Sequence, residues 1–116
     1  MKVVYASRGG NVSAFVKKLG ADDLVKIETG DEKVEGEYIL ITYTDGKGDM
    51  PKVVAKFLEA NAAGMKGVAA SGNKDHFAAT FAGAADKIAE QYGVPVIAKF
   101  DSEGMAPDVE TVKAAL

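Results

Sequence analysis

The chain has 116 residues, no cysteine and a formal net charge of −3 at neutral pH. This length predicts a single domain over residues 1–116, with one hydrophobic core. The absence of cysteine excludes a disulfide framework and a thiolate nucleophile and favours a cytoplasmic location, while the acidic balance argues against a nucleic-acid-binding surface. Because Met1 and Lys2 lead directly into a short apolar segment, we expect neither a signal peptide nor a membrane span.

Strands and helices alternate along the chain in the hydrophobic pattern. In chain order the pattern predicts a strand at Val3–Ala6, a helix at Asn11–Leu19, a strand at Leu24–Ile27, a strand at Tyr38–Thr42, a helix from Pro51 to about Asn61, a strand at Val68–Ser71, a helix at Phe77–Tyr92, a strand at Val94–Phe100 and a helix at Pro107–Leu116. The run Tyr38–Thr42 is typical of a central parallel strand, since it is apolar almost throughout.

This alternation indicates an α/β fold, because each right-handed crossover between parallel strands places its helix on a face of the sheet. We predict a flavodoxin-like, doubly wound, five-stranded parallel sheet with the order 2-1-3-4-5. In such a sheet ligands bind beyond the carboxyl ends of strands 1 and 3. The loops that follow the first, third and fourth strands are therefore the candidate site.

The first of these loops has the composition of a phosphate-binding turn. It connects an apolar strand directly to an amphipathic helix and contains Ser7, Arg8, Gly9, Gly10, Asn11 and Val12. Glycine permits the backbone angles of a tight turn, and the helix N-terminus presents N–H groups and a positive dipole to an anion. We expect Asn11 to cap the helix. A plain helix N-terminus without a ligand is the alternative.

The other two loops are rich in hydroxyl, amide and glycine residues, as expected where backbone approaches a planar polar ligand. The loop after the third strand contains Thr42, Tyr43, Thr44, Asp45, Gly46, Lys47 and Gly48. The loop after the fourth strand contains Ser71, Gly72, Asn73, Asp75, His76 and Phe77. The parallel topology predicts that these loops converge with the first at one edge of the sheet.

Several other sites are excluded by the sequence. A dinucleotide fingerprint fails because Pro51 stands where its third glycine is required, and no Walker loop follows the first strand. His76 is the only histidine, so a metal site built on several imidazoles is impossible and we predict no metal site. A phospho-receiver domain would need an acidic pair after the first strand, where Tyr5, Ala6 and Ser7 stand.

The motifs in these loops resemble those of the NrdI family, the small flavodoxin-like stimulatory proteins of ribonucleotide reductase. The resemblance is carried by residues 7–12, 40–48 and 71–73, by Lys99 and Phe100, and by Gly104 with residues 108–110. It covers nearly the whole chain. The family's phosphate turn commonly has threonine where this chain has Gly9, and the loop from Lys74 to Ala78 is longer than usual by about one residue.

This resemblance implies an FMN protein whose phosphate lies on residues 7–12 and whose flavin ring lies between the other two loops, with His76 or Phe77 as its outer contact. It implies an accessory redox protein rather than a stand-alone enzyme. In the reduced state such a protein reacts with O2 and supplies superoxide, or a related oxidant, to the small subunit of a class Ib-type ribonucleotide reductase. The flavin reductant stays unknown, and a one-electron-transfer flavodoxin is the alternative.

Gly46 is the predicted redox switch of this site. Reduction turns the flavin N5 atom from a hydrogen-bond acceptor into a donor, so an adjacent peptide that turns its carbonyl towards N5 would stabilise the reduced forms. Glycine permits that reorientation, whereas a residue with a Cβ resists positive φ angles.

Overall fold

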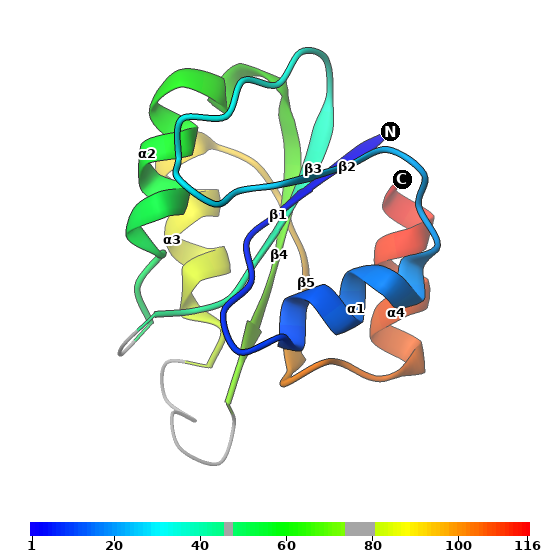
Figure 1. Cartoon of the computed structure of the whole chain (residues 1–116). Helices are drawn as coiled ribbons and strands as arrows, with labels where there is room; N and C mark the ends of the chain where they lie inside the picture. The colour runs from blue at the N-terminus through cyan, green and yellow to red at the C-terminus, as the bar shows by residue number, and fades with distance from the viewer. Residues whose placement is uncertain (46–47, 74–80) are drawn as a thin grey trace.

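The computed structural model describes residues 1–45, 48–73 and 81–116, and it shows a parallel sheet of five strands in the order β2-β1-β3-β4-β5 (Figure 1). The strands are β1 (Lys2–Tyr5), β2 (Leu24–Lys26), β3 (Tyr38–Thr42), β4 (Met65–Gly72) and β5 (Val96–Asp101). The predicted fold class and strand order are confirmed. The apolar run Tyr38–Thr42 is buried along its whole length, as its central position requires.

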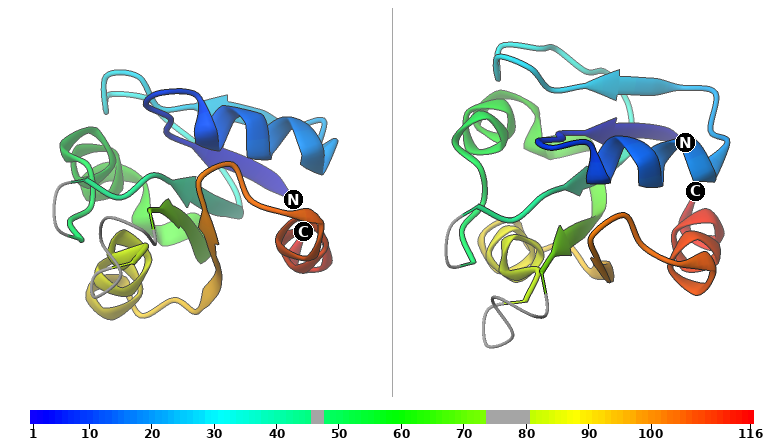
Figure 2. Two further views of the ribbon diagram at one scale, coloured as in Figure 1. Left: turned by 90° about the horizontal axis from the view of Figure 1, so that it is seen from below. Right: turned by 60° about the horizontal axis from the view of Figure 1, so that its bottom comes forward.

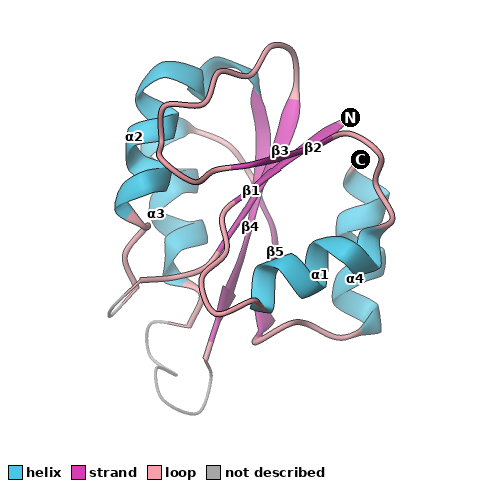
Figure 3. Ribbon diagram, in the orientation of Figure 1, coloured by secondary structure: helices cyan, strands magenta, loops and turns pink. Residues whose placement is uncertain are grey.

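Helices cover both faces of the sheet. The helices are α1 (Asn11–Leu19), α2 (Lys52–Asn61), α3 (Gly83–Tyr92) and α4 (Ala106–Ala115), with a short 3-10 turn at Ala62–Gly64 after α2. Figures 2 and 3 show α1 and α4 on one side of the sheet and α2 and α3 on the other. None of the described helices is long and apolar enough to cross a membrane.

Side chains that alternate along the central strands supply a separate apolar cluster to each layer of helices. From β3, Tyr38 and Leu40 pack in the cluster that includes Phe57 of α2 and Ile88 of α3. The intervening Ile39 and Ile41 pack in the other cluster, with residues of α1 and α4. This period of two is the ordinary consequence of strand geometry, and it allows one strand to anchor both layers.

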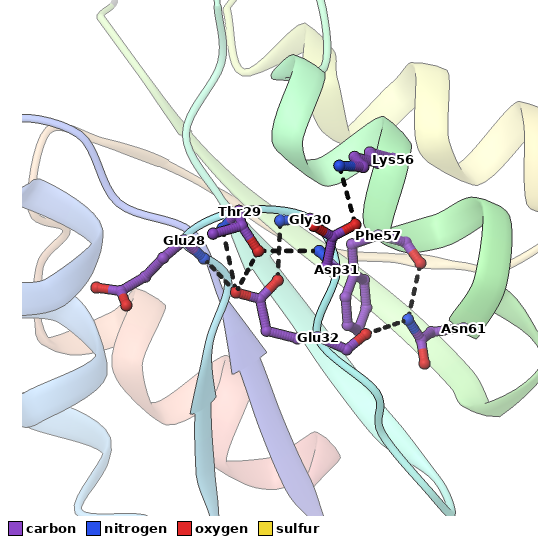
Figure 4. Close-up of polar contacts among 8 residues, drawn as sticks. All are labelled: Glu28, Thr29, Gly30, Asp31, Glu32, Lys56, Phe57 and Asn61. Carbon is purple, nitrogen blue, oxygen red and sulfur yellow. Dashed lines mark hydrogen bonds and ion pairs between the residues drawn. The ribbon is translucent and has the colours of Figure 1, made fainter.

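The polar connection between β2 and β3 is held in place by one carboxylate (Figure 4). Glu32 accepts hydrogen bonds from the backbone N–H groups of Glu28 and Thr29 at 2.9 and 3.1 Å, and from Gly30 at 2.9 Å. Desolvation alone would raise the pKa of this carboxyl, but the backbone donors outweigh it and lower the pKa to about 2. The side chain of Asn61 then ties the connection to α2 by donating to the Glu32 carbonyl at 2.8 Å.

Element bounds differ from the predicted ones where pairing or turns decide them. β4 begins at Met65 because Met65 and Gly67 pair with Tyr38 and Ile39 of the neighbouring strand. The prediction that a helix runs on from Phe77 is wrong for residues 81–82, which form a turn before α3 begins at Gly83. Phe77 itself lies outside the described residues.

Candidate functional site

The turn between β1 and α1 is an open backbone cradle. Gly9 and Gly10 have φ angles of 76° and 90°, and a Cβ added to either would meet nothing within 4 Å. The prediction that Asn11 caps the helix is wrong: Gly10 occupies the cap position and makes no side-chain bond, and Asn11 is the first helical residue. The capping oxygen comes from Ser7, whose Oγ accepts the N–H of Ser13 at 3.1 Å. The Ser7 hydroxyl still has its own proton to donate.

The loop after β3 is closed on itself and packed against α3. The N–H groups of Asp45 and Asp49 each donate to the other residue's carbonyl at 2.8 Å. Gly48 lies against Gly83, where an added Cβ would come within 2.9 Å of the Gly48 Cα and carbonyl oxygen. Asp49 also forms an ion pair with Lys87 of α3. These contacts fix the described ends of this loop beside the start of α3.

A pocket of about 460 Å³ lies at the carboxyl edge of the sheet, onto which the left view of Figure 2 looks. Its volume is within the ordinary range for small-molecule sites. Its walls come from the loops after β1, β3 and β4, together with the start of α3 and the turn after β5: Arg8, Asn11, Tyr43, Thr44, Asp45, Ser71, Gly72, Asn73, Ala82 and Ser102. The structure thus brings the described parts of the three predicted loops to one pocket.

Two residues of this wall were not predicted from the sequence. Ala82 and Ser102 have φ angles of 50° and 54°, and they are the non-glycine residues with positive φ in the described part of the chain. The N–H of Ser102 donates to the Gly72 carbonyl at 2.9 Å, which holds the turn after β5 beside the loop after β4. Strained backbone of this kind gathers at functional sites. For Ser102 the sequence did offer one indication: it follows the fifth strand, and residues just after parallel strands lie at the ligand-binding edge of the sheet.

The side chain of Thr44 contains a buried oxygen without a hydrogen-bond partner among the described residues. Within residues 1–45, 48–73 and 81–116, its Oγ1 is the buried side-chain oxygen or nitrogen that has no hydrogen-bond partner. A buried hydroxyl without a partner costs free energy, and Thr44 also lines the pocket. The buried hydroxyl of Thr42, in contrast, donates to the Tyr43 carbonyl at 2.9 Å. A ligand in the pocket is therefore a candidate partner for Thr44.

The remaining predicted site residues divide into three groups. Ser7 lines a smaller neighbouring pocket of about 280 Å³, and Arg8 and Tyr43 belong to the walls of both pockets. Val12 is fully buried in the core beneath α1, so only its backbone could serve a ligand. Five predicted residues lie outside the described part of the chain: Gly46, Lys47, Asp75, His76 and Phe77.

The open turn, the pocket and the unpaired Thr44 hydroxyl suit a ligand with a phosphate at one end and a polar ring at the other. The glycines of the turn leave space for an anion to approach the helix N-terminus, and the loops after β3 and β4 present hydroxyl and backbone groups to a ring. Among the described residues, no three histidine, cysteine, aspartate or glutamate side chains gather in a way that could hold a metal ion.

Solved structures with a similar fold include flavodoxins. A short-chain flavodoxin associated with a PDU bacterial microcompartment is 21% identical, with a TM-score of 0.63 over 97% of this chain and 90% of that one. A Fusobacterium nucleatum flavodoxin bound to flavin mononucleotide is 20% identical, with a TM-score of 0.59 over 83% of this chain and 67% of that one. At these identities the likeness shows the fold.

Sequence comparison identifies the family. Protein NrdI of Bacillus licheniformis is 44% identical over 110 residues, which are 95% of this chain and 82% of that protein. The family model described as NrdI flavodoxin-like matches residues 3–114. The resemblance found in the loop motifs is thereby confirmed, and the chain belongs to the NrdI flavodoxin-like family.

Proposed function

We propose that this chain binds FMN in the pocket at the carboxyl edge of its sheet and, when reduced, supplies an oxidant for activating a class Ib-type ribonucleotide reductase. The observation that carries the proposal is that, in an NrdI-family chain, the unpaired Thr44 hydroxyl lies in a pocket whose wall includes Arg8 and Asn11, the residues on either side of the open glycine turn. Flavodoxins of the same fold bind flavin mononucleotide, which supports the choice of ligand.

In this proposal the phosphate binds at the turn between β1 and α1. The first N–H groups of a helix have no partner within the helix, and Ser13 has already donated its own to Ser7. This leaves the N–H groups of Gly10, Asn11 and Val12 for the anion. The Ser7 hydroxyl supplies a further donor, so that backbone N–H groups and Ser7 hold the phosphate without the threonine that the family commonly has at the position of Gly9.

The flavin ring would lie along the pocket between the loops after β3 and β4. Tyr43, Thr44 and Ser71 line that part of the pocket and offer an aromatic face and hydroxyl groups. When bound and reduced, FMN would supply the redox chemistry, the one-electron reduction of O2 to superoxide. The protein's part is to hold the ring where O2 can reach it and where the partner subunit can receive the oxidant.

The test is activation of the partner by the reduced protein. The FMN-loaded chain is reduced without air and mixed with O2 in the presence of a class Ib small subunit loaded with Mn(II). We expect a tyrosyl radical in the electron paramagnetic resonance spectrum, and its yield should fall when superoxide is removed competitively. Free reduced FMN at the same concentration is the control.

A one-electron-transfer flavodoxin is the competing function, and the same experiment separates the two. A protein that binds FMN and passes electrons to an acceptor but yields no radical above the free-FMN control would be a carrier. That result would contradict the oxidant-supplying role while leaving the flavin site intact.

A further inference from the structure

Arg8 belongs by sequence to the phosphate turn, but its side chain contacts the loop after β3. Its guanidinium donates to Asp45 Oδ1 at 3.0 Å, and its Cζ lies 4.8 Å from the centre of the Tyr43 ring. Both contacts are made with residues of the loop after β3 that line the larger pocket. A guanidinium that is paired with a carboxylate and stacked on an aromatic ring is not directed at an anion in the turn.

Asp45 connects this contact to the rest of the site. It forms the backbone bridge with Asp49 that closes the loop, and Asp49 pairs with Lys87 of α3. A continuous set of contacts therefore runs from the phosphate turn through Arg8, Asp45 and Asp49 to α3. Arg8 and Tyr43 together also form the wall shared by the two neighbouring pockets.

We infer that Arg8 is a positioning residue for the ring-binding half of the site rather than a phosphate ligand. This inference rests on the proposed function for the identity of the ligand. Arg8 holds Tyr43 and Asp45 in place, so that this wall of the pocket is already formed before the flavin ring binds. The chemical consequence is that Arg8 affects the affinity for any flavin, with or without a phosphate.

Riboflavin separates the two roles, because it has the flavin ring without the phosphate. With Arg8→Gln, we expect the affinities for FMN and riboflavin to fall by the same factor of about threefold to tenfold, the usual scale of one exposed ion pair and one cation–π contact. If Arg8 were a phosphate ligand, Arg8→Gln would instead lower the affinity for FMN and leave the affinity for riboflavin unchanged. That result, or no loss with either flavin, would overturn the inference.

Asp45→Asn gives a second test in which the two roles predict opposite signs. If Arg8 is a positioning residue, losing its carboxylate partner should weaken both flavins, and combining the two substitutions should add little. If Arg8 is a phosphate ligand, releasing it from Asp45 should tighten FMN binding. Lys56→Gln is the matched control, since it removes an exposed ion pair of similar length, 2.9 Å to Asp31, away from the pocket.

A measurement without flavin keeps this inference distinct from the proposed function. A double-mutant cycle of Arg8→Gln and Asp45→Asn on unfolding of the flavin-free protein should give a coupling between the two residues, together with changed ring signals of Tyr43 in the nuclear magnetic resonance spectrum. Zero coupling and unchanged Tyr43 signals would overturn the inference. A wild-type chain that binds neither flavin would contradict the proposed function instead.

Discussion

The rings of Phe15 and Phe100 stack in the core between α1 and β5, with centroids 3.9 Å apart and planes 9° from parallel. Gly104, in the turn after β5, lies directly against them: a Cβ there would be 2.6 Å from Phe15 Cδ2 and 3.3 Å from Phe100 Cδ2. The stacked pair therefore leaves no room for a side chain at this position. This contact joins the turn after β5 to α1, the helix that follows the glycine turn after β1.

Gly104→Ala should destabilise the protein strongly, and Gly9→Ala gives a matched comparison. Both glycines have a φ of 76°, but a Cβ at Gly9 meets nothing within 4 Å. We expect Gly9→Ala to lower the free energy of unfolding by about 1–2 kcal/mol through its backbone conformation alone. Gly104→Ala should lose about a further 1–3 kcal/mol from overpacking. Equal losses of the free energy of unfolding in urea would show that the Phe15 and Phe100 rings move aside without destabilising the protein.

Thr44→Val tests whether the unpaired hydroxyl serves the ligand. The variant should be about 1 kcal/mol more stable than the wild type without flavin, because it removes a buried polar group that lacks a partner. Its affinity for FMN should fall by about threefold to tenfold, the value of one neutral hydrogen bond.

Thr42→Val is the control for Thr44→Val, since it makes the same change at a hydroxyl that already donates to the Tyr43 carbonyl. It should lower the free energy of unfolding by about 1 kcal/mol. Unchanged FMN affinity in Thr44→Val would remove this hydroxyl from the proposed site.

Glu32 gives a prediction about acid stability. Its pKa is lowered from 4.5 to about 2 in the folded protein, so its contribution is fully present above about pH 4.5 and is lost as the pH falls towards 2. Glu32→Gln should cost about 1 kcal/mol at pH 7, similar to the loss of a helix cap. The difference between wild type and variant should shrink over this acidic range. A constant difference from pH 7 to pH 2 would contradict the role given to the carboxylate, and Glu35→Gln controls for general loss of negative charge.

Replacing the Asn61 amide with a carboxylate should destabilise the protein strongly. Its Nδ2 donates to the Glu32 and Phe57 carbonyls at 2.8 and 2.9 Å, and its Oδ1 accepts the Val34 N–H at 3.0 Å. In Asn61→Asp an acceptor oxygen would face two carbonyl oxygens in a buried site, so we expect a loss of about 3 kcal/mol or more. Asn61→Ala removes the bonds without adding the repulsion. Thermal unfolding should therefore rank Asn61→Asp below Asn61→Ala at pH 7.

The elements that follow hydrophobic periodicity were predictable, and those set by local turn geometry were not. The bounds of α1 and β3 agree with the prediction because the stripe Val12, Phe15, Val16 and Leu19 and the run Tyr38–Thr42 each bury one continuous surface. The helix cap was not predictable in the same way. Ser7 and Asn11 both have side chains that can cap a helix. Gly10, in the left-handed conformation, takes the cap position, and the capping hydrogen bond is made by Ser7.

The convergence of the loops followed from parallel topology alone, but the direction of individual side chains did not. By sequence Arg8 belongs to the turn between β1 and α1, and its contacts with Asp45 and Tyr43 direct its side chain to the loop after β3. Ser102 and Ala82 carry no sequence signal for their positive φ angles, because tertiary contacts such as the bond from Ser102 to Gly72 impose them.

Titration of the purified chain with FMN, followed by its backbone amide signals, tests the central claim most directly. We predict saturation at one FMN per chain, with the signals of Gly10, Thr44 and Ser102 shifting together along a single binding curve, because one ligand would fill the pocket that these loops share. No shift with oxidised or reduced FMN, or shifts confined to one loop, would contradict a single flavin site at this edge of the sheet.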